Sequence, residues 1–360
     1  MSLNRNYWLM ILMLVCSFSA SAVNTAIQIF DTDEPLRLNT TARLLFEPDG
    51  QRYSLEEVLE RRTQFTWPFS SNPNYGFSES GLWLYNRFSN VSEASEFVFD
   101  IGFAQNDTVE FYLVERDKIL ASAITGKKHS GSVYRFPTME ATLPYATEVE
   151  LFVRVESLRQ RLVVPLDVQA KNSHTIMTSL DYTLWGVFYG GILILMFYNL
   201  MLFLGTKEPS LIAYIVYLST VLFWQFIWGG HSQIFFSGDA GQWLNDHTGL
   251  IFLLVGIGAG VFTKTFLNTH ETAPRMHRIY KPLFVILVAL IPVSVFNEVP
   301  AFWQNLLVYT ASMLSICIYL LSGFESYLNQ FKPARYFIFA WSLLLTCALV
   351  GLLGLVGLLP

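Results

Sequence analysis

The sequence predicts a multidomain fold, in which a β-sandwich is followed by a bundle of membrane-spanning α-helices. Residues 36–170 are polar and show the period-two pattern of strands, whereas residues 184–360 form a row of uncharged apolar stretches. The composition agrees: 52% of the 360 residues are hydrophobic and 14% are charged, against about 25% charged residues in soluble domains. We therefore expect one domain in water and one in lipid.

The N-terminus predicts a signal peptide over residues 1–22. Arg5 supplies the positive flank, residues 7–18 form a short apolar core, and Ala20-Ser21-Ala22 fits a small-residue cleavage site. An uncleaved anchor helix is the alternative, but the core is too short to span a membrane well. Residues 23–35 then form a lead segment, and the domain that follows is expected to be exported.

The exported part is acidic and carries no cysteine. Residues 23–181 hold 15 Lys/Arg and 22 Asp/Glu, and 15 minus 22 gives a net charge of −7. Such a balance argues against nucleic acid as a partner, because phosphates require a basic surface. After cleavage only Cys317 and Cys347 remain, both in apolar stretches. The exported domain must therefore be stable through its core alone.

The apolar half predicts six spans and an orientation. Residues 171–183 are expected to be a linker, and the spans are 184–204, 211–228, 248–266, 282–296, 302–324 and 336–359. If the first span runs inward, the outer connections 229–247 and 297–301 contain no Lys or Arg. The inner connections are 205–210, 264–281, which includes the end of the third span, and 325–335. They contain seven, as the positive-inside rule requires: Lys207, Lys264, Arg275, Arg278, Lys281, Lys332 and Arg335. The basic run 275–281 also predicts contact with lipid head groups.

Six runs in the exported part predict strands, and the turn residues between them predict a β-sandwich of jelly-roll type. The runs are 36–46, 81–88, 96–103, 108–114, 149–155 and 162–168, with turns at 47–50, 71–74 and 116–118. A short helix should begin after Ser54, with Glu57 completing a capping box.

The candidate ligand contacts of the exported domain are aromatic residues and arginines. Aromatic rings stack on sugar rings, and Arg donates in a fixed fork to carboxylates. Along strand 81–88 the period of two puts Trp83, Tyr85 and Arg87 on one face, but either face could be the core. Packing in the core is thus the alternative for each aromatic candidate. The predicted contacts are Trp67, Tyr75, Trp83, Tyr85, Arg87 and Arg135, with Phe69 as a further aromatic neighbour.

The chain offers no pattern typical of catalysis, metal binding or cofactor binding. Its six histidines lack ligand spacing, and there is no phosphate-binding glycine loop, nucleophile elbow or kinase motif. The predicted spans have no charged residue in their interiors, which weakens a proton-coupled transporter. We expect no metal, no cofactor and no enzymatic activity in this chain.

Several segments resemble one family. Residues 81–90 resemble the tryptophan-to-asparagine strand in the sensor domain of bacterial seven-transmembrane receptors with diverse intracellular signalling modules. Tyr189-Gly190-Gly191, residues 197–203 and residues 262–267 are similar to its membrane spans. The resemblance covers 36–360, with one departure: the motif commonly has Arg two residues after the Trp, where this chain has Tyr85.

The resemblance implies a receptor in the bacterial inner membrane, with its N-terminal domain in the periplasm and a sugar or other small molecule as ligand. The family has seven spans and then a cytoplasmic output domain, such as a diguanylate cyclase or a histidine kinase. Because six spans place the C-terminus outside, we expect the seventh span and the output domain to be missing. A homodimer stays open as the assembly.

Three functional hypotheses follow. The first is the input half of a receptor, in which the sandwich binds a ligand and the bundle passes the change inward. The second is a transporter or channel with an exported accessory domain, which would need polar residues or broken helices at mid-depth. The third is a periplasmic protein-docking module, which would need an exposed apolar patch.

Overall fold

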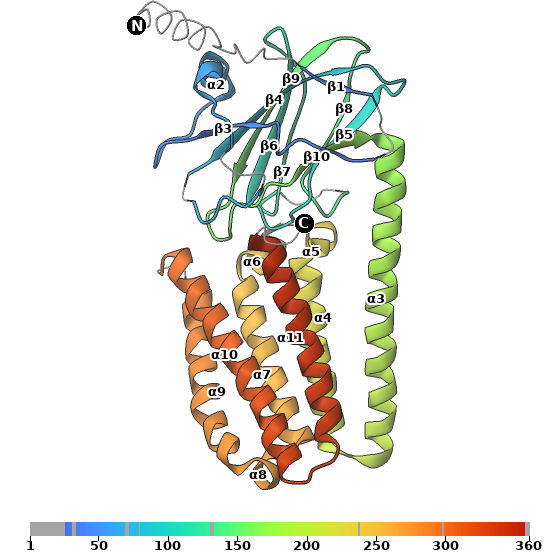
Figure 1. Ribbon diagram of the computed structural model, residues 1–360, viewed down its shortest axis with the longest axis vertical. Helices are drawn as coiled ribbons and strands as arrows, with labels where there is room; N and C mark the ends of the chain where they lie inside the picture. Colours follow the sequence, from blue (N-terminus) through green and yellow to red (C-terminus); the bar gives the residue numbers. More distant parts are fainter. Residues whose placement is uncertain are drawn as a thin grey trace, which may run out of the picture.

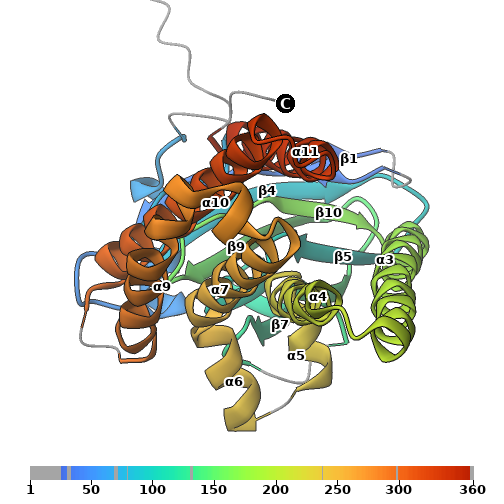
Figure 2. The same ribbon diagram turned by 90° about the horizontal axis from the view of Figure 1, so that it is seen from below.

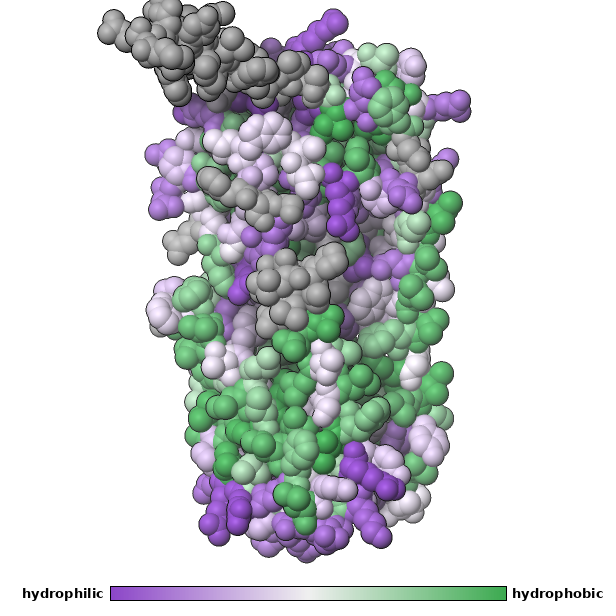
Figure 3. Space-filling model, in the orientation of Figure 1, coloured by the Kyte–Doolittle hydropathy of each residue, from purple (hydrophilic) through white to green (hydrophobic). Residues whose placement is uncertain are grey.

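The computed structural model describes residues 26–30, 34–68, 72–78, 80–129, 133–236, 238–296 and 299–356. A β domain stands on one end of a helical bundle, and the bundle carries a broad apolar surface (Figures 1 and 3). The predicted signal peptide, residues 1–22, and Phe69 lie outside the described residues.

The β domain is a sandwich of two sheets, as predicted. The larger sheet, called sheet A, contains β1 (Ile27–Ile29), β3 (Arg43–Phe46), β4 (Leu82–Asn90), β6 (Thr108–Glu115), β7 (Lys118–Thr125) and β9 (Glu148–Glu156). The smaller sheet, called sheet B, has the order β2 (Leu36–Arg37), β10 (Leu166–Ala170), β5 (Glu96–Ile101) and β8 (Thr138–Thr142). The jelly-roll part of the expectation stays a prediction.

Sheet A has a core on each of its faces. Leu82, Leu84 and Phe88 of β4 point into the space between the two sheets, where they join a large apolar cluster. Trp83 and Tyr85 point the other way, into a smaller cluster. This second core is covered by helix α2 (Leu55–Glu60) and the short helix η1 (Arg62–Gln64). A strand buried on both faces has no polar side to reveal its orientation, which is why its alternation was ambiguous.

The structure confirms the predicted capping box of α2 and the predicted turn of one hairpin. The Glu57 backbone N–H donates to Ser54 Oγ at 3.3 Å, and the Ser54 N–H donates to the Glu57 carboxylate at 2.8 Å. Arg116 and Asp117 both have positive φ angles, and they form the predicted turn between β6 and β7. The predicted strand 36–46 was wrong in extent, because it divides into β2 and β3 in different sheets. Strands β1, β7 and β8 were not predicted.

The helical part has one long helix at the position of each predicted span. These helices are α3 (Lys171–Thr206), α4 (Pro209–Trp228), α7 (Thr248–Phe266), α9 (Pro274–Val295), α10 (Ala301–Leu328) and α11 (Ala334–Val356). The first five are long and apolar enough to cross a membrane, and α11 contains a shorter apolar helical stretch, Ala334–Cys347. Residues 357–359 of the sixth predicted span lie outside the described chain. Short helices fill the connections: α5 (His231–Phe235), α6 (Gly238–Asp246) and α8 (Thr269–Thr272).

The expected linker 171–183 is not a separate segment. β10 ends at Ala170 and α3 begins at Lys171, so sheet B continues directly into the first spanning helix. The 36 residues of α3 measure about 54 Å at 1.5 Å per residue. One rigid element therefore reaches from the sandwich to the opposite end of the bundle.

Helix α3 stands apart from the other spans. Only 6% of its apolar window is buried, compared with 39% for α7 and for α10. α4 and α7 pack closely, because Gly258 lets the backbone of Tyr217 approach. Tyr319 of α10 donates to the Gly256 carbonyl of α7 at 2.8 Å. Seen along the bundle, α3 lies at its edge beside α4 (Figure 2).

Candidate functional site: the contacts between the sandwich and the helices

Neutral amide side chains connect the sandwich to α4, α5, α7 and α10. Gln105 Nε2 donates to the carbonyls of Ile227 and Trp228, at 3.1 and 2.9 Å. Gln233 Nε2 returns a hydrogen bond to the Ala104 carbonyl at 2.6 Å. Further along the interface, Gln160 Nε2 donates to the Thr248 hydroxyl, and Asn305 Nδ2 donates to the Arg159 carbonyl. We call these hydrogen bonds the amide clamp.

A buried ion pair supports the same side of the interface. Lys127 lies 2.8 Å from Asp107, and both side chains are only 1% exposed. Asp246 at the end of α6 lies 3.5 Å from Lys127. Burial alone would raise the pKa of Asp107, but Lys127 and the Leu158 backbone N–H hold that pKa below its usual value. Asp107 therefore stays charged and joins the sandwich loops to α6.

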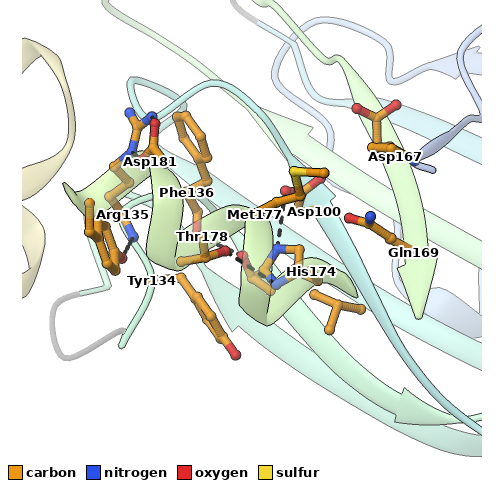
Figure 4. Close-up of a pocket in the computed structure, with 14 residues that line it drawn as sticks. Asp100, Tyr134, Arg135, Phe136, Asp167, Gln169, His174, Met177, Thr178 and Asp181 are labelled. Carbon is orange, nitrogen blue, oxygen red and sulfur yellow. Dashed lines mark hydrogen bonds and ion pairs between the residues drawn. The ribbon is translucent and has the colours of Figure 1, made fainter. Parts of the chain in front are cut away.

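Helix α3 contacts the sandwich in a different way, across a cleft. The first turns of α3 cross the outer face of sheet B and enclose a cavity of about 200 Å³ (Figure 4). The helix contributes one face at a spacing of three and four residues: His174, Met177, Thr178 and Asp181. The sheet contributes Val98, Asp100, Thr138, Asp167 and Gln169, and the loop before β8 adds Tyr134, Arg135 and Phe136. We call this cavity the sheet–helix cleft.

Arg135 forms one end of the cleft and joins three elements. Its Nε and Nη2 atoms each lie 2.7 Å from a carboxylate oxygen of Asp181 on α3. Its Nη1 atom donates to the Gly229 carbonyl at the end of α4, at 3.1 Å. The guanidinium also lies over the rings of Phe136 and Trp185. A bidentate arginine fixes both distance and angle, so Arg135 sets the position of α3 relative to α4.

The backbone at Gly230 makes this contact possible. Gly230 has a φ of +83°, and a Cβ added there would lie 2.5 Å from the Arg135 carbonyl oxygen. Next to it, the His231 ring is packed against Tyr182, Trp185 and Tyr189 of α3. Burial, with Arg135 nearby, lowers the pKa of His231 to about 4. A neutral aromatic contact therefore accompanies the charged one.

The floor of the cleft carries two adjacent carboxylates. Asp167 on β10 is the cross-strand partner of Asp100 on β5 and of Arg37 on β2. Burial and the charge of Asp100 raise the pKa of Asp167 to about 6, against the smaller opposing effect of Arg37. On the helix side, His174 Nε2 lies 3.5 Å from Asp100. Figure 4 shows His174 between Asp100 and Thr178.

The first residue of α3 has further charged neighbours. Lys171 lies 2.7 Å from Glu140 and 3.5 Å from Glu96. Hydrogen bonds from Lys171 and from Tyr134 lower the pKa of Glu140. The α3 contacts thus include partly exposed ion pairs beside the aromatic contact of His231, whereas the hydrogen bonds of the amide clamp are neutral.

Two of the predicted ligand contacts lie in the second core. Trp83 is 1% exposed and Tyr85 is 5% exposed. Trp83 Nε1 donates to Glu47 at 2.8 Å, and the Tyr85 hydroxyl donates to Glu150 at 2.7 Å. Both rings are covered by α2 and its neighbours, so they are not available to stack on a ligand in this structure.

The other predicted contacts are distributed over the domain. Tyr75 packs against Phe46 and the main core. Trp67 is 55% exposed, with the Arg43 guanidinium 4.8 Å from its ring centroid. Arg87 pairs with Glu148. Of the six predicted residues, only Arg135 lines the sheet–helix cleft.

Sequence reasoning did not select Asp100, Asp167 or His174. The sequence does contain a signal for the two aspartates. Each is a charged residue inside a strand, 96–101 or 166–170, whose alternate residues are apolar. Their partner His174 was placed in a linker, where no face could be assigned to it. Recognising that α3 begins at Lys171 would have put His174 and Asp181 on one helix face.

Comparisons with known proteins agree with this two-part architecture. The family model described as 7TM diverse intracellular signalling matches residues 181–360, and that described as 7TMR-DISM extracellular 2 matches residues 41–170. A search of curated proteins finds no match.

A search of solved structures finds weak likenesses. One is a glycoside hydrolase family 43 arabinoxylan arabinofuranohydrolase from Bacillus subtilis, in complex with cellotetraose, at 13% identity and a TM-score of 0.22. The likeness covers 41% of this chain and 28% of that one, and at this level it carries no conclusion on fold or ligand.

The two family matches follow each other along the chain with the boundary at the start of α3. The match over residues 41–170 corresponds to the sandwich, and the match over residues 181–360 corresponds to the helical bundle. The chain is therefore a multi-pass membrane protein with an N-terminal periplasmic domain, and it belongs to the seven-transmembrane receptors with diverse intracellular signalling modules.

Proposed function

We propose that this protein is a sensory receptor whose ligand binds in the sheet–helix cleft and repositions α3. Family membership establishes a receptor-like signalling protein with an extracellular sensor. The single observation that supports the cleft as the site is its position: one wall is sheet B and the other is the first spanning helix. A ligand there contacts both domains at once.

The ligand class we propose is a small polar molecule, with carbohydrate as the first candidate. The cavity of about 200 Å³ suits a small ligand. Its lining combines carboxylates, the Gln169 amide and the rings of Tyr134 and Phe136. Polar groups that fix orientation beside aromatic rings are typical of small-molecule sites, and aromatic faces stack on sugar rings.

The proposed relay begins at α3 because this helix has few other supports. The amide clamp holds α4, α5, α7 and α10 against the sandwich. A ligand that favours one position of α3 over another shifts the population of the two arrangements. Since α3 is one continuous helix, a shift at Asp181 reaches Thr206 at its far end.

We further propose that the output lies in a cytoplasmic module of the full-length protein, such as a diguanylate cyclase or a histidine kinase, and that this chain is the non-enzymatic input part. A homodimer would suit such an output. Contact of the inner basic residues 275–281 with anionic lipid heads belongs to the same proposal.

Thermal-shift and calorimetric binding measurements on the whole chain in nanodiscs test the proposed function. The panel contains monosaccharides, disaccharides, polyols, amino acids and small carboxylic acids. We expect at least one compound to raise the unfolding temperature. Thr178→Trp, which fills the cleft, should abolish that shift, while Thr175→Trp, on the exposed side of the same helix, should retain it.

Two outcomes would count against the proposal. No stabilising compound in the panel would remove the small-ligand hypothesis, and equal binding by both Trp variants would move the site away from the cleft. Solute uptake into proteoliposomes would instead support the transporter hypothesis.

A further inference from the structure

We propose that the sheet–helix cleft is also a proton sensor, in which a proton on Asp167 changes the contact between Asp100 and His174 and thereby the position of α3 on sheet B. This inference concerns regulation of the site proposed above. Its test needs no ligand, so the two can fail separately.

The arrangement of charges gives the first argument. Asp100 and Asp167 are directly opposite each other on neighbouring antiparallel strands. Two like charges in that position repel each other. Asp167 Oδ1 is buried and makes no hydrogen bond within the described part of the chain. A proton on Asp167 would remove the repulsion at its source.

The position of the helix gives the second argument. His174 is buried, lies 3.5 Å from Asp100, and packs its ring against Tyr134. Asp100 is thus the cross-strand partner of Asp167 and, at the same time, the contact of His174 on α3. A change in the charge of Asp167 therefore reaches α3 through Asp100 and His174.

The other charged groups near Asp167 are either exposed or bound to partners of their own. Arg37 on β2 is its other cross-strand neighbour and is exposed. On α3, Asp181 is bound to Arg135, and Lys171 is bound to Glu140 and Glu96. Tyr134 donates to Glu140. The carboxylates of Asp100 and Asp167 thus have His174 and Arg37 as their nearby positive or protonatable groups.

The titration range agrees with the geometry. The raised pKa of Asp167, about 6, lies in the range in which a periplasmic group meets changes of external acidity. Asp167 then gains its proton as the pH falls through about 6. Asp167→Asn keeps the size of the side chain but removes its titratable group, so this variant tests the charge of Asp167 alone.

Distance measurements between two spin labels test the proton sensor. The labels are placed by Thr142→Cys on β8 and Leu180→Cys on α3, both exposed positions, in a whole chain whose three native cysteines are replaced by serine. In nanodiscs without ligand, we expect the mean distance to shift between pH 7.5 and pH 5.0.

Charge variants then identify the groups. Asp167→Asn should give the parent chain's pH 5.0 distance already at pH 7.5, with a smaller pH response. Adding His174→Gln, which removes the contact with Asp100, should abolish the response. The matched control is Asp117→Asn, an exposed partner of Arg62 on the far hairpin, which should respond as the parent chain does. An unchanged distance in the parent chain, or a full response in the double variant, would overturn the inference.

Discussion

The sandwich is connected to the amide-clamped helices and to α3 by contacts of different chemistry. Buried amides bind backbone carbonyls of α4 and the sandwich, as Gln105 and Gln233 do. Ion pairs at the cleft connect the sandwich to α3, as Arg135 and Asp181 do. Neutral hydrogen bonds do not titrate, and the Lys127–Asp107 pair beside them is buried and therefore little screened, whereas the partly exposed ion pairs at α3 respond to salt and ligands. The comparison indicates that one interface fixes the sandwich and the other can report its state.

The largest expected effect comes from breaking the amide clamp. Gln105→Ala removes the donor to the Ile227 and Trp228 carbonyls, and Gln105 is only 1% exposed. Unsatisfied buried polar groups cost about 1–3 kcal/mol, so the unfolding temperature of the whole chain should fall clearly, and equally at pH 5.0 and 7.5. Thr142→Ala, at an exposed strand position, is the control. A loss confined to one pH would contradict a neutral clamp.

A smaller effect on stability is expected at Arg135. Arg135→Gln removes the bidentate contact with Asp181 and the donor to Gly229. Because Asp181 is about one-third exposed, solvent screening limits the loss to about 1 kcal/mol. Hydrogen exchange should become faster in residues 171–183, while residues 248–266 stay protected. Equal loosening of both segments would show that Arg135 supports the whole interface rather than α3.

The smallest expected effect on stability comes from replacing Asp167, and here the stability should rise, whereas the two preceding variants lower it. A carboxyl with a raised pKa in the folded state stabilises the fold at low pH, and that stability is lost as the pH rises to about 6. Asp167→Asn should therefore raise the unfolding temperature at pH 7.5 and leave it almost unchanged at pH 4. Asp117→Asn serves as the control. A lower unfolding temperature at pH 7.5 would mean that the charged form of Asp167 is favourable.

The sequence predicted what depends on local pattern. The six spans, the capping box of α2 and the β6–β7 turn each have a signal within a few residues. Strand β7, with the sequence KILASAIT, lacked the polar alternation of an exposed strand and was not found. The division of 36–46 into two sheets depends on pairing with β4 and β10, which are distant in the sequence.

The candidate site was harder to predict, because its residues meet only after both domains are in place. Arg135 and Asp181 are 46 positions apart, and Asp100 meets His174 through a helix that continues from β10. Trp83 and Tyr85 had the residue types of a ligand face, but α2 covers them. Residue type alone could not distinguish a second core from an open aromatic face.

The most direct test compares two label pairs in the same protein, in nanodiscs at pH 5.0 and 7.5 and with any ligand found in the binding panel. Thr142→Cys with Leu180→Cys reports sheet B against α3, and Ser122→Cys with Ala240→Cys, also exposed, reports the sandwich against α6. We predict that the first distance changes and the second stays constant. A change in the second pair with a constant first pair would contradict α3 as the moving element.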